Sequence, residues 1–149
     1  MKKKKMNHKV VESEIENRKS KIVFFDGNCP MCNSWVKRLI RMDHRKLFRF
    51  APLEGETAQQ LLTPLLPDYL KEDTIVYYDD GHFYLRSQAA LRIGKALGFP
   101  YDLSIVFSVV PLSLRDSVYR WVASRRYKYG ERYDSCPIPP SEWRDRFLS

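Results

Sequence analysis

The pattern of hydrophobic and polar positions predicts a strand, a helix and a second strand in the first third of the chain. The run KIVFF at 21–25 is β-branched and aromatic and ends at Asp26-Gly27, as a buried strand before a turn does. Apolar residues then recur at helical spacing on one face: Cys32, Trp35, Val36, Leu39 and Ile40. The run LFRFA at 47–51 predicts a second strand, so the three segments form a βαβ unit with parallel strands.

The next stretch predicts a short helix and a β-hairpin. ETAQQLLTPLL at 56–66 has helical spacing and contains the helix breaker Pro64. TIVYYDDGHFYLR at 74–86 is rich in β-formers, and its central Asp80-Gly81 suits a two-residue type I′ turn. One parallel pair and one hairpin together make a mixed four-stranded sheet.

Two longer helices are expected after the hairpin. Ser87 can cap a helix that Gly98 ends, and Ser113 can start another that reaches about Tyr129. The element order is therefore β-α-β-α-β-β-α. This order predicts an α/β fold with a C-terminal helical extension from about residue 100.

Length and composition describe one folded domain with a tail. The chain has 149 residues, 44% of them hydrophobic and 30% charged, which suits a single domain with its own core. LSIVFSVVPL at 103–112 is the most apolar stretch. It has about half of the ~20 residues that span a bilayer, so we expect it inside the core. We assign residues 1–20 to a disordered basic tail and 21–149 to one domain that includes the extension.

Positive charge is concentrated in the tail. The formal net charge is +8, and residues 1–20 carry seven Lys or Arg against three Glu. No apolar segment follows Lys2–Lys5, so we expect no export signal, and three cysteines, an odd number, favour a cytoplasmic protein over a disulfide-stapled one. The tail is either simply solvated or docks on nucleic acid or anionic lipid.

Cys29 and Cys32 form a C-x-x-C motif between the first strand and its helix. Unsatisfied amides and the helix dipole place partial positive charge there, which stabilises a thiolate. We expect Cys29, ahead of the helix, to be the more exposed sulfur and Cys32 to face inward. The predicted reaction is thiol–disulfide exchange, in which Cys29 attacks a partner disulfide and Cys32 resolves the mixed disulfide. A structural pair without turnover is one alternative.

A metal site is another alternative for the cysteine pair. Structural zinc needs four ligands, and Cys29, Cys32 and Cys136 supply three. No histidine forms a second tight ligand pair with Cys136. The three histidines are His8, His44 and His82. His44, at the end of the first helix, complements the helix dipole, and His82 is expected to be exposed beside the hairpin turn.

Three neighbours of the cysteines are candidate auxiliary residues. Asp26, before a glycine at a strand end, is expected to accept backbone amides in an Asx turn. It could also tune the thiols, by raising the pKa of a nearby thiol or by accepting a proton from Cys32. Gly27 supplies a backbone conformation that a Cβ would hinder, and Pro30 lacks an amide, which costs little at a helix start.

Two further features lie in the C-terminal third. Cys136 is either a buried small hydrophobe or a third redox thiol that the C-terminal end brings to the pair. YRWVASRRYKYGER at 119–132 interleaves arginines with aromatic residues. An amphipathic helix with a solvated basic face explains this stretch, and nucleic acid is the less favoured partner because no base-reading module is visible.

FFDGNCPMC resembles the D-G-x-C-x-x-C signature of the DCC family of thiol-disulfide oxidoreductases, which is named for its Asp-Cys-Cys motif. Asp26, Cys29 and Cys32 match the three named positions. VYYDDGHFYLRSQAALRI is similar to the family's middle part, and YKYGERYDSCPIPP, with Gly130 and Cys136, is similar to its ending. The resemblance covers about residues 20–140.

The resemblance implies a thioredoxin-like architecture, which agrees with the predicted element order, and thiol–disulfide exchange activity. The chain departs from thioredoxin-like enzymes in one respect. These usually place a cis-proline just before the third strand, facing the active disulfide, whereas LKEDTIVYY contains no proline. Thioredoxin-style binding of extended peptides is therefore not expected.

These observations predict a thiol-disulfide oxidoreductase that acts on a protein or small-molecule thiol or disulfide. Its catalytic residues are Cys29, Cys32 and Asp26, and it needs no cofactor beyond the dithiol. No transmembrane segment is expected. The alternatives are a non-catalytic binding module that uses the basic helix and tail, and a metal-binding protein with cysteine ligands.

Overall fold

The computed structural model describes most of the chain after the tail: residues 21–64, 66, 74–125, 128, 131, 133–134, 136–137 and 139–148. The predicted basic tail at 1–20 lies outside the described residues, so its state and the domain boundary remain predictions. The element order and the sheet agree with the predicted α/β fold.

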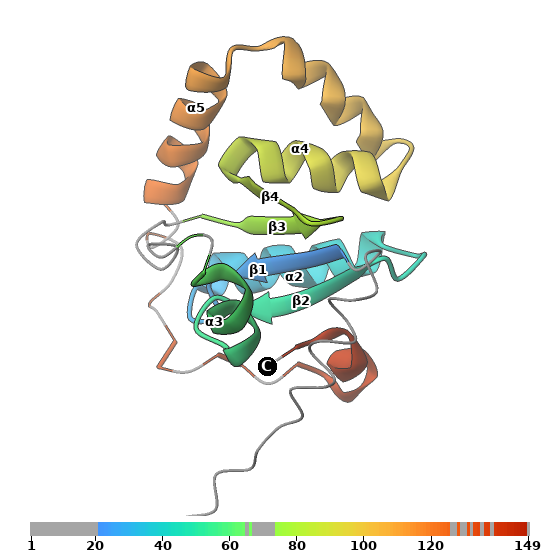
Figure 1. Ribbon diagram of the computed structural model, residues 1–149, viewed down its shortest axis with the longest axis vertical. Coiled ribbons are helices and arrows are strands. Elements are labelled where there is room, and N and C mark those ends of the chain that lie inside the picture. Colours follow the sequence, from blue (N-terminus) through green and yellow to red (C-terminus); the bar gives the residue numbers. More distant parts are fainter. Residues whose placement is uncertain are drawn as a thin grey trace, which may run out of the picture.

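The first half of the sheet is the predicted βαβ unit. β1 (Lys21–Phe25) pairs in parallel with β2 (Phe48–Pro52), and α2 (Pro30–Met42) makes the connection between them (Figure 1). The amide of Leu53 donates to the carbonyl of Phe25 at 2.8 Å and so continues this pairing beyond β2. The C-terminal end of β1, where α2 begins, is therefore held firmly in the sheet.

The second half of the sheet is the predicted hairpin. β3 (Val76–Asp79) pairs antiparallel with both β1 and β4 (His82–Leu85), which gives the strand order β2-β1-β3-β4. Both Asp80 and Gly81 have positive φ, at 49° and 82°, which confirms the type I′ turn. The mixed four-stranded sheet is thus as predicted.

Helices cover both faces of the sheet. α2 and α4 (Arg86–Leu97) lie on one face, and the short α3 (Glu56–Leu62), which ends before Pro64, lies on the other. Alternate residues of β1 point to the two faces: Val23 and Phe25 pack toward α2 and α4, whereas Ile22 and Phe24 pack toward α3.

The predicted cap of α4 is wrong. The helix begins at Arg86 after Leu85, and Ser87 lies inside its first turn. The Ser87 hydroxyl instead hydrogen-bonds to the carboxylate of Asp116 at 2.5 Å, so a contact with a residue 29 positions further along the chain has replaced the local cap. The expected stop at Gly98 is confirmed, because this C-cap residue has a φ of 81°.

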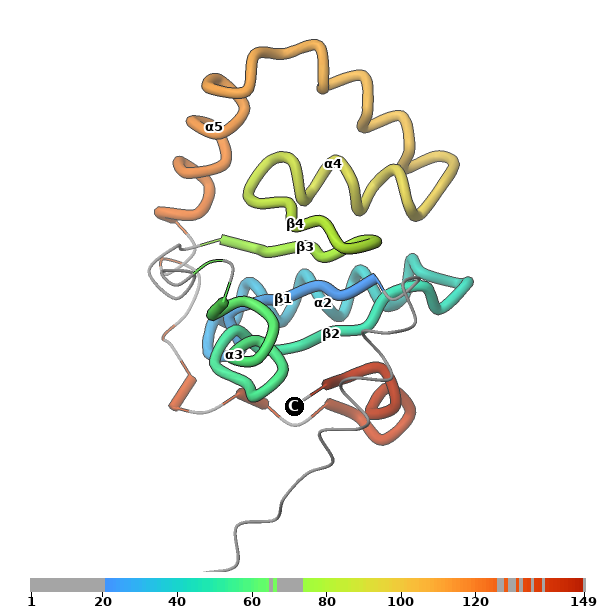
Figure 2. The backbone as a smooth tube through the Cα atoms, viewed as in Figure 1, coloured from blue at the N-terminus to red at the C-terminus, as the bar shows by residue number. Residues whose placement is uncertain are grey.

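The apolar segment after α4 does not lie in the core, so that prediction is wrong. A 3₁₀ helix, η2 (Tyr101–Val109), and α5 (Leu112–Ser124) form an arch beside α4 (Figure 2). Neither element contains a buried residue, and Val109 is 85% exposed. The physical reason is that α2, α4 and α3 already cover the two faces of the sheet. Within the described residues, no helix combines the length and apolar character needed to cross a bilayer.

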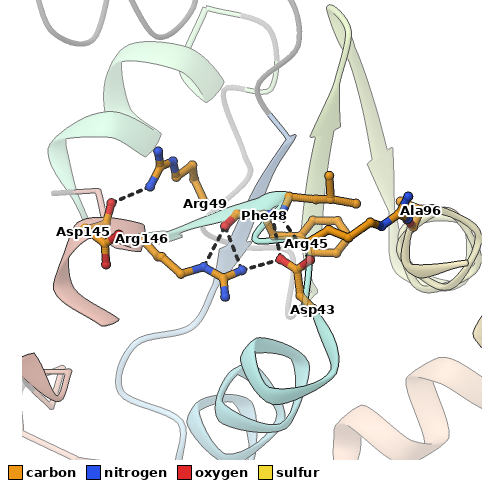
Figure 3. Close-up of polar contacts among 8 residues, drawn as sticks. Asp43, Arg45, Phe48, Arg49, Ala96, Asp145 and Arg146 are labelled. Carbon is orange, nitrogen blue, oxygen red and sulfur yellow. Dashed lines mark hydrogen bonds and ion pairs between the residues drawn. The ribbon is translucent and has the colours of Figure 1, made fainter. Parts of the chain in front are cut away.

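The C-terminal end returns to the sheet beside β2, as Figure 3 shows. The predicted last helical turn from Ser141 is a 3₁₀ helix, η4 (Ser141–Arg146). The Arg146 guanidinium forms a buried ion pair with Asp43 and also donates to the carbonyl of Phe48. The ring of Phe147 lies 5.6 Å from that of Phe50, so both charge and packing anchor this end.

Candidate active site

A tight turn carries the chain from β1 into α2. The carboxylate of Asp26 accepts the amide of Asn28 at 3.0 Å, which is the predicted Asx turn, and the amide of Cys29 donates to the carbonyl of Asp26 at 3.3 Å. Cys29 is thereby placed at the N-cap of α2, with Pro30 as the first helical residue.

The two cysteines of the motif are close together, and neither is part of a disulfide. The Sγ of Cys29 accepts a hydrogen bond from the amide of Cys32 at 3.4 Å. This sulfur therefore acts as the helix cap and satisfies one of the amides at the N-terminus that have no partner within the helix. Such a bond is stronger when the sulfur carries a negative charge.

The prediction that Cys29 is the more exposed of the two cysteines is wrong, whereas the prediction that Cys32 faces inward is confirmed by its burial. Cys29 is fully buried, whereas Cys32 is 7% exposed. The C-terminal part of the chain lies against the motif loop, where the amide of Tyr133 donates to the carbonyl of Asn28 at 2.8 Å. Helix position alone could not reveal this contact, because it joins residues far apart in the sequence.

Asn33 is a positioning residue that the sequence analysis did not single out. Its side-chain amide donates to the carbonyls of Gly27 at 2.7 Å and of Cys29 at 3.0 Å. These bonds tie the first turn of α2 to the loop before it, so they hold the cysteines in place. An asparagine directly after a C-x-x-C pair was the available clue, since Asn bonds readily to nearby backbone.

Cys136 also lies at the motif. It packs against the hydrophobic cluster that contains Cys29 and Cys32, and its Sγ is 2.8 Å from the position that a Cβ on Gly27 would occupy. Gly27 is thus required by the close approach of the C-terminal segment. Burial, followed by the charges of Glu54 and Asp26, raises the pKa of the Cys136 thiol.

An apolar cavity of about 280 Å³ opens at Cys32. Its lining comes from α2, α4 and α5, together with Ile75 just before β3. The lining residues are Met31, Cys32, Trp35, Ile75, Ala90, Tyr119, Val122 and Ala123. The sequence did not predict that Tyr119 and Val122 line a cavity at Cys32, because the stretch at 119–132 was interpreted through its basic residues.

The other candidate ligands lie apart from this arrangement. His44 and His82 are both exposed, as expected for His82, and His8 lies outside the described residues. Among the residues that the structure describes, no three His, Cys, Asp or Glu side chains are grouped so as to hold a metal ion. Gly130 also lies outside the described residues. Arg125, the C-cap residue of α5, is described, and its Cζ lies over the Trp121 ring at 4.0 Å from the ring centroid.

A C-x-x-C pair at the first turn of the helix after β1, beside a mixed α/β sheet, defines the class of protein to which this chain is similar. The chain belongs to the DCC1-like thiol-disulfide oxidoreductase family, whose model matches residues 23–132. This membership confirms the resemblance seen in the sequence.

Two relatives extend over most of the chain. YuxK, an uncharacterized protein of Bacillus subtilis, is 34% identical over 139 residues, which cover 93% of this chain and 99% of YuxK. A chloroplastic DCC family protein of Arabidopsis thaliana is 33% identical over 133 residues, which cover 87% of this chain and 76% of the plant protein. No solved structure matches the chain.

Proposed function

We propose that this protein performs thiol–disulfide exchange with Cys29 and Cys32 as its redox pair. The observation that carries the proposal is the hydrogen bond from the amide of Cys32 to the Sγ of Cys29 at the start of α2. A helix N-terminus presents amides without partners in the helix, and this bond places the Cys29 sulfur where such amides can donate to it during exchange. Membership of the DCC1-like family supports the same reaction class.

The two cysteines and the substrate disulfide account for all atoms and electrons of the reaction, without a further cofactor. One thiolate attacks a substrate disulfide, which yields a mixed disulfide and releases one substrate thiolate. The second cysteine then attacks the mixed disulfide, releases the other substrate thiolate and closes the Cys29–Cys32 bond. The two cysteine protons pass to the two released sulfurs, and the reverse sequence oxidises a substrate dithiol.

Asp26 takes part as a positioning residue in this proposal. Its carboxylate holds the Asx turn by accepting the amide of Asn28, and this turn delivers Cys29 to the helix cap. Asp26→Asn retains an acceptor oxygen for the turn and removes the charge, whereas Asp26→Ala removes both. If the Asp26 carboxylate instead accepted a proton during exchange, both variants would lose the same factor in exchange rate and the same pH dependence of that rate.

Redox titration of the full chain tests the proposal. The protein is equilibrated with glutathione buffers of increasing oxidised fraction, quenched in acid and analysed by intact mass and peptide mapping. We expect a Cys29–Cys32 disulfide with a defined midpoint potential, and the same midpoint within experimental error in Cys136→Ala. A pair that stays reduced in the most oxidising buffer contradicts the proposal and leaves a binding module or a structural pair.

A further inference from the structure

The cavity at Cys32 continues into a larger apolar groove. A second cavity, of about 580 Å³, lies between α4, the end of η2 and α5. The two cavities share Ala90, Tyr119 and Val122 in their walls. They are therefore adjacent, and together they run from Cys32 along α5 toward Leu114. The volume of the second cavity is typical of small-molecule sites.

Two polar side chains along this groove are already engaged, whereas the buried Nε of Arg115, in the wall of the larger cavity, has no hydrogen-bond partner among the described residues. The hydroxyl of Tyr119 accepts the amide of Ile75 at 3.0 Å, and the hydroxyl of Ser87 bonds to the carboxylate of Asp116. The surface that a ligand would contact in the groove is therefore mainly apolar. An apolar chain gains free energy there from burial, whereas a polar chain would lose hydrogen bonds to water.

The same contacts disfavour an extended peptide. A peptide that adds to a sheet edge needs free backbone amides beside the redox pair. Ile75 is the residue just before β3, and its amide is occupied by Tyr119 of α5. The side chains of these two residues also form part of the wall of the cavity at Cys32.

We infer that the substrate is a small thiol or disulfide with an apolar chain, that the chain occupies the groove between α4 and α5, and that Cys32 is the sulfur it reaches. This inference rests on the proposed function and reverses the expected order of the two cysteines. Cys32 lines the cavity, whereas Cys29 is fully buried and is not among the lining residues.

The exchange then proceeds in a defined order. The Cys32 thiolate attacks the substrate disulfide R–S–S–R′, forms Cys32–S–S–R and releases R′S⁻. Cys29, whose Sγ lies 3.4 Å from the amide of Cys32, next attacks the Cys32 sulfur and releases RS⁻. The protein dithiol is oxidised by two electrons, and the substrate disulfide is reduced to two thiols that take up the cysteine protons.

Alkyl methanethiosulfonates with methyl, butyl and octyl chains test the groove. Each reagent transfers its alkylthio group to a thiolate and releases methanesulfinate. In the wild-type chain the second cysteine would then displace the alkylthiol, so the reduced Cys29→Ser and Cys32→Ser variants are treated briefly instead. The adduct at the remaining cysteine of the motif persists in each variant, and peptide mapping follows how fast it forms. We expect faster modification at Cys32 than at Cys29, with a rate at Cys32 that rises about two- to four-fold per methylene relative to a cysteine-containing peptide, until the groove is filled.

Ala90 is exposed on α4 and lines both cavities, so the larger side chain of Ala90→Trp would occupy the groove where the two cavities meet. In the Cys29→Ser background, we expect Ala90→Trp to retain the rate with the methyl reagent and to lose the gain with octyl. Gln88→Trp is the matched control, because Gln88 is exposed on the same helix and lines neither cavity. It should keep the full dependence on chain length.

The possible outcomes separate the two proposals. Faster modification at Cys29 than at Cys32, or a rate independent of chain length, overturns the inference even if the glutathione titration shows a Cys29–Cys32 disulfide. A strong dependence on chain length without such a disulfide leaves the apolar site in place and overturns the proposed redox function. Loss of chain-length dependence in Gln88→Trp also counts against the groove.

Discussion

The hydroxyl of Tyr119 on α5 accepts a hydrogen bond from the amide of Ile75 at 3.0 Å, just before β3. The hydroxyl of Thr74 lies 3.4 Å from the same phenol oxygen. α5 contains no buried residue, and this hydrogen bond is one of the contacts that attach it to the domain. The bond also joins two parts of the lining of the cavity at Cys32, because both residues line it.

Tyr119→Phe removes this tie and leaves the ring in place. The amide of Ile75 then lacks its acceptor, so we expect a loss of about 1 kcal/mol in the free energy of unfolding. Hydrogen exchange should become faster at Ile75 and along α5. Tyr101→Phe, at an exposed phenol, serves as the control and should change neither quantity. Unchanged exchange along α5 in Tyr119→Phe would show that the bond does not hold the helix.

Gly27→Ala should destabilise the protein through Cys136. The added Cβ would meet Cys136 at 2.8 Å and Pro52 at 3.2 Å, closer than ordinary contact, so we expect a loss of about 1–3 kcal/mol. Cys136→Gly removes the first clash. A urea-denaturation cycle of the two single variants and the double variant should therefore give a smaller cost for Gly27→Ala when position 136 is Gly. Equal costs in both backgrounds contradict the contact.

Arg146→Met should be strongly destabilising, because it leaves Asp43 buried without its cation. We expect the free energy of unfolding, measured by urea denaturation, to fall by about 3–5 kcal/mol. The hydrogen bonds that Asp43 still accepts from the amides of Leu47 and Phe48 should reduce this loss. Lys21→Met is the matched control, since its pair with Asp79 is about one-quarter exposed and should cost under about 1 kcal/mol. Similar losses in the two variants would argue against a structural role for the buried pair.

Alkylation of Cys136 should begin only at high pH. Its pKa is raised by burial first and by Glu54 and Asp26 next, so the thiol stays protonated at neutral pH. Iodoacetamide mapping should show its midpoint above that of a free cysteine, about 8.5. Glu54→Gln should lower the midpoint, and Glu56→Gln, the control, should not. No shift in Glu54→Gln would contradict the electrostatic contribution.

The same raised pKa has a consequence for stability. The folded state holds the Cys136 proton more tightly than the unfolded state does. Its contribution is therefore complete below the pKa of the unfolded thiol and is lost as the pH rises through the raised folded value. Cys136→Ala should reduce the loss of stability at alkaline pH, measured by urea denaturation across that range.

The local pattern of residues determined the sheet and the place of the cysteine pair. KIVFF, the helical spacing after Cys32 and the Asp80-Gly81 turn each act within a few residues, and the structure has β1, α2 and the β3–β4 hairpin where these patterns predict them. The Asx turn of Asp26 was predictable for the same reason, because it needs only the neighbouring amide of Asn28.

Contacts between distant segments decided the rest. The burial of Cys29, the approach of Cys136 to Gly27 and the bond from Ile75 to Tyr119 join residues separated by tens of positions, and no local pattern encodes such pairs. The exposure of 103–112 has the same origin. Its apolar composition predicts burial, but α2, α3 and α4 already occupy the faces of the sheet, so only the tertiary structure could place it outside.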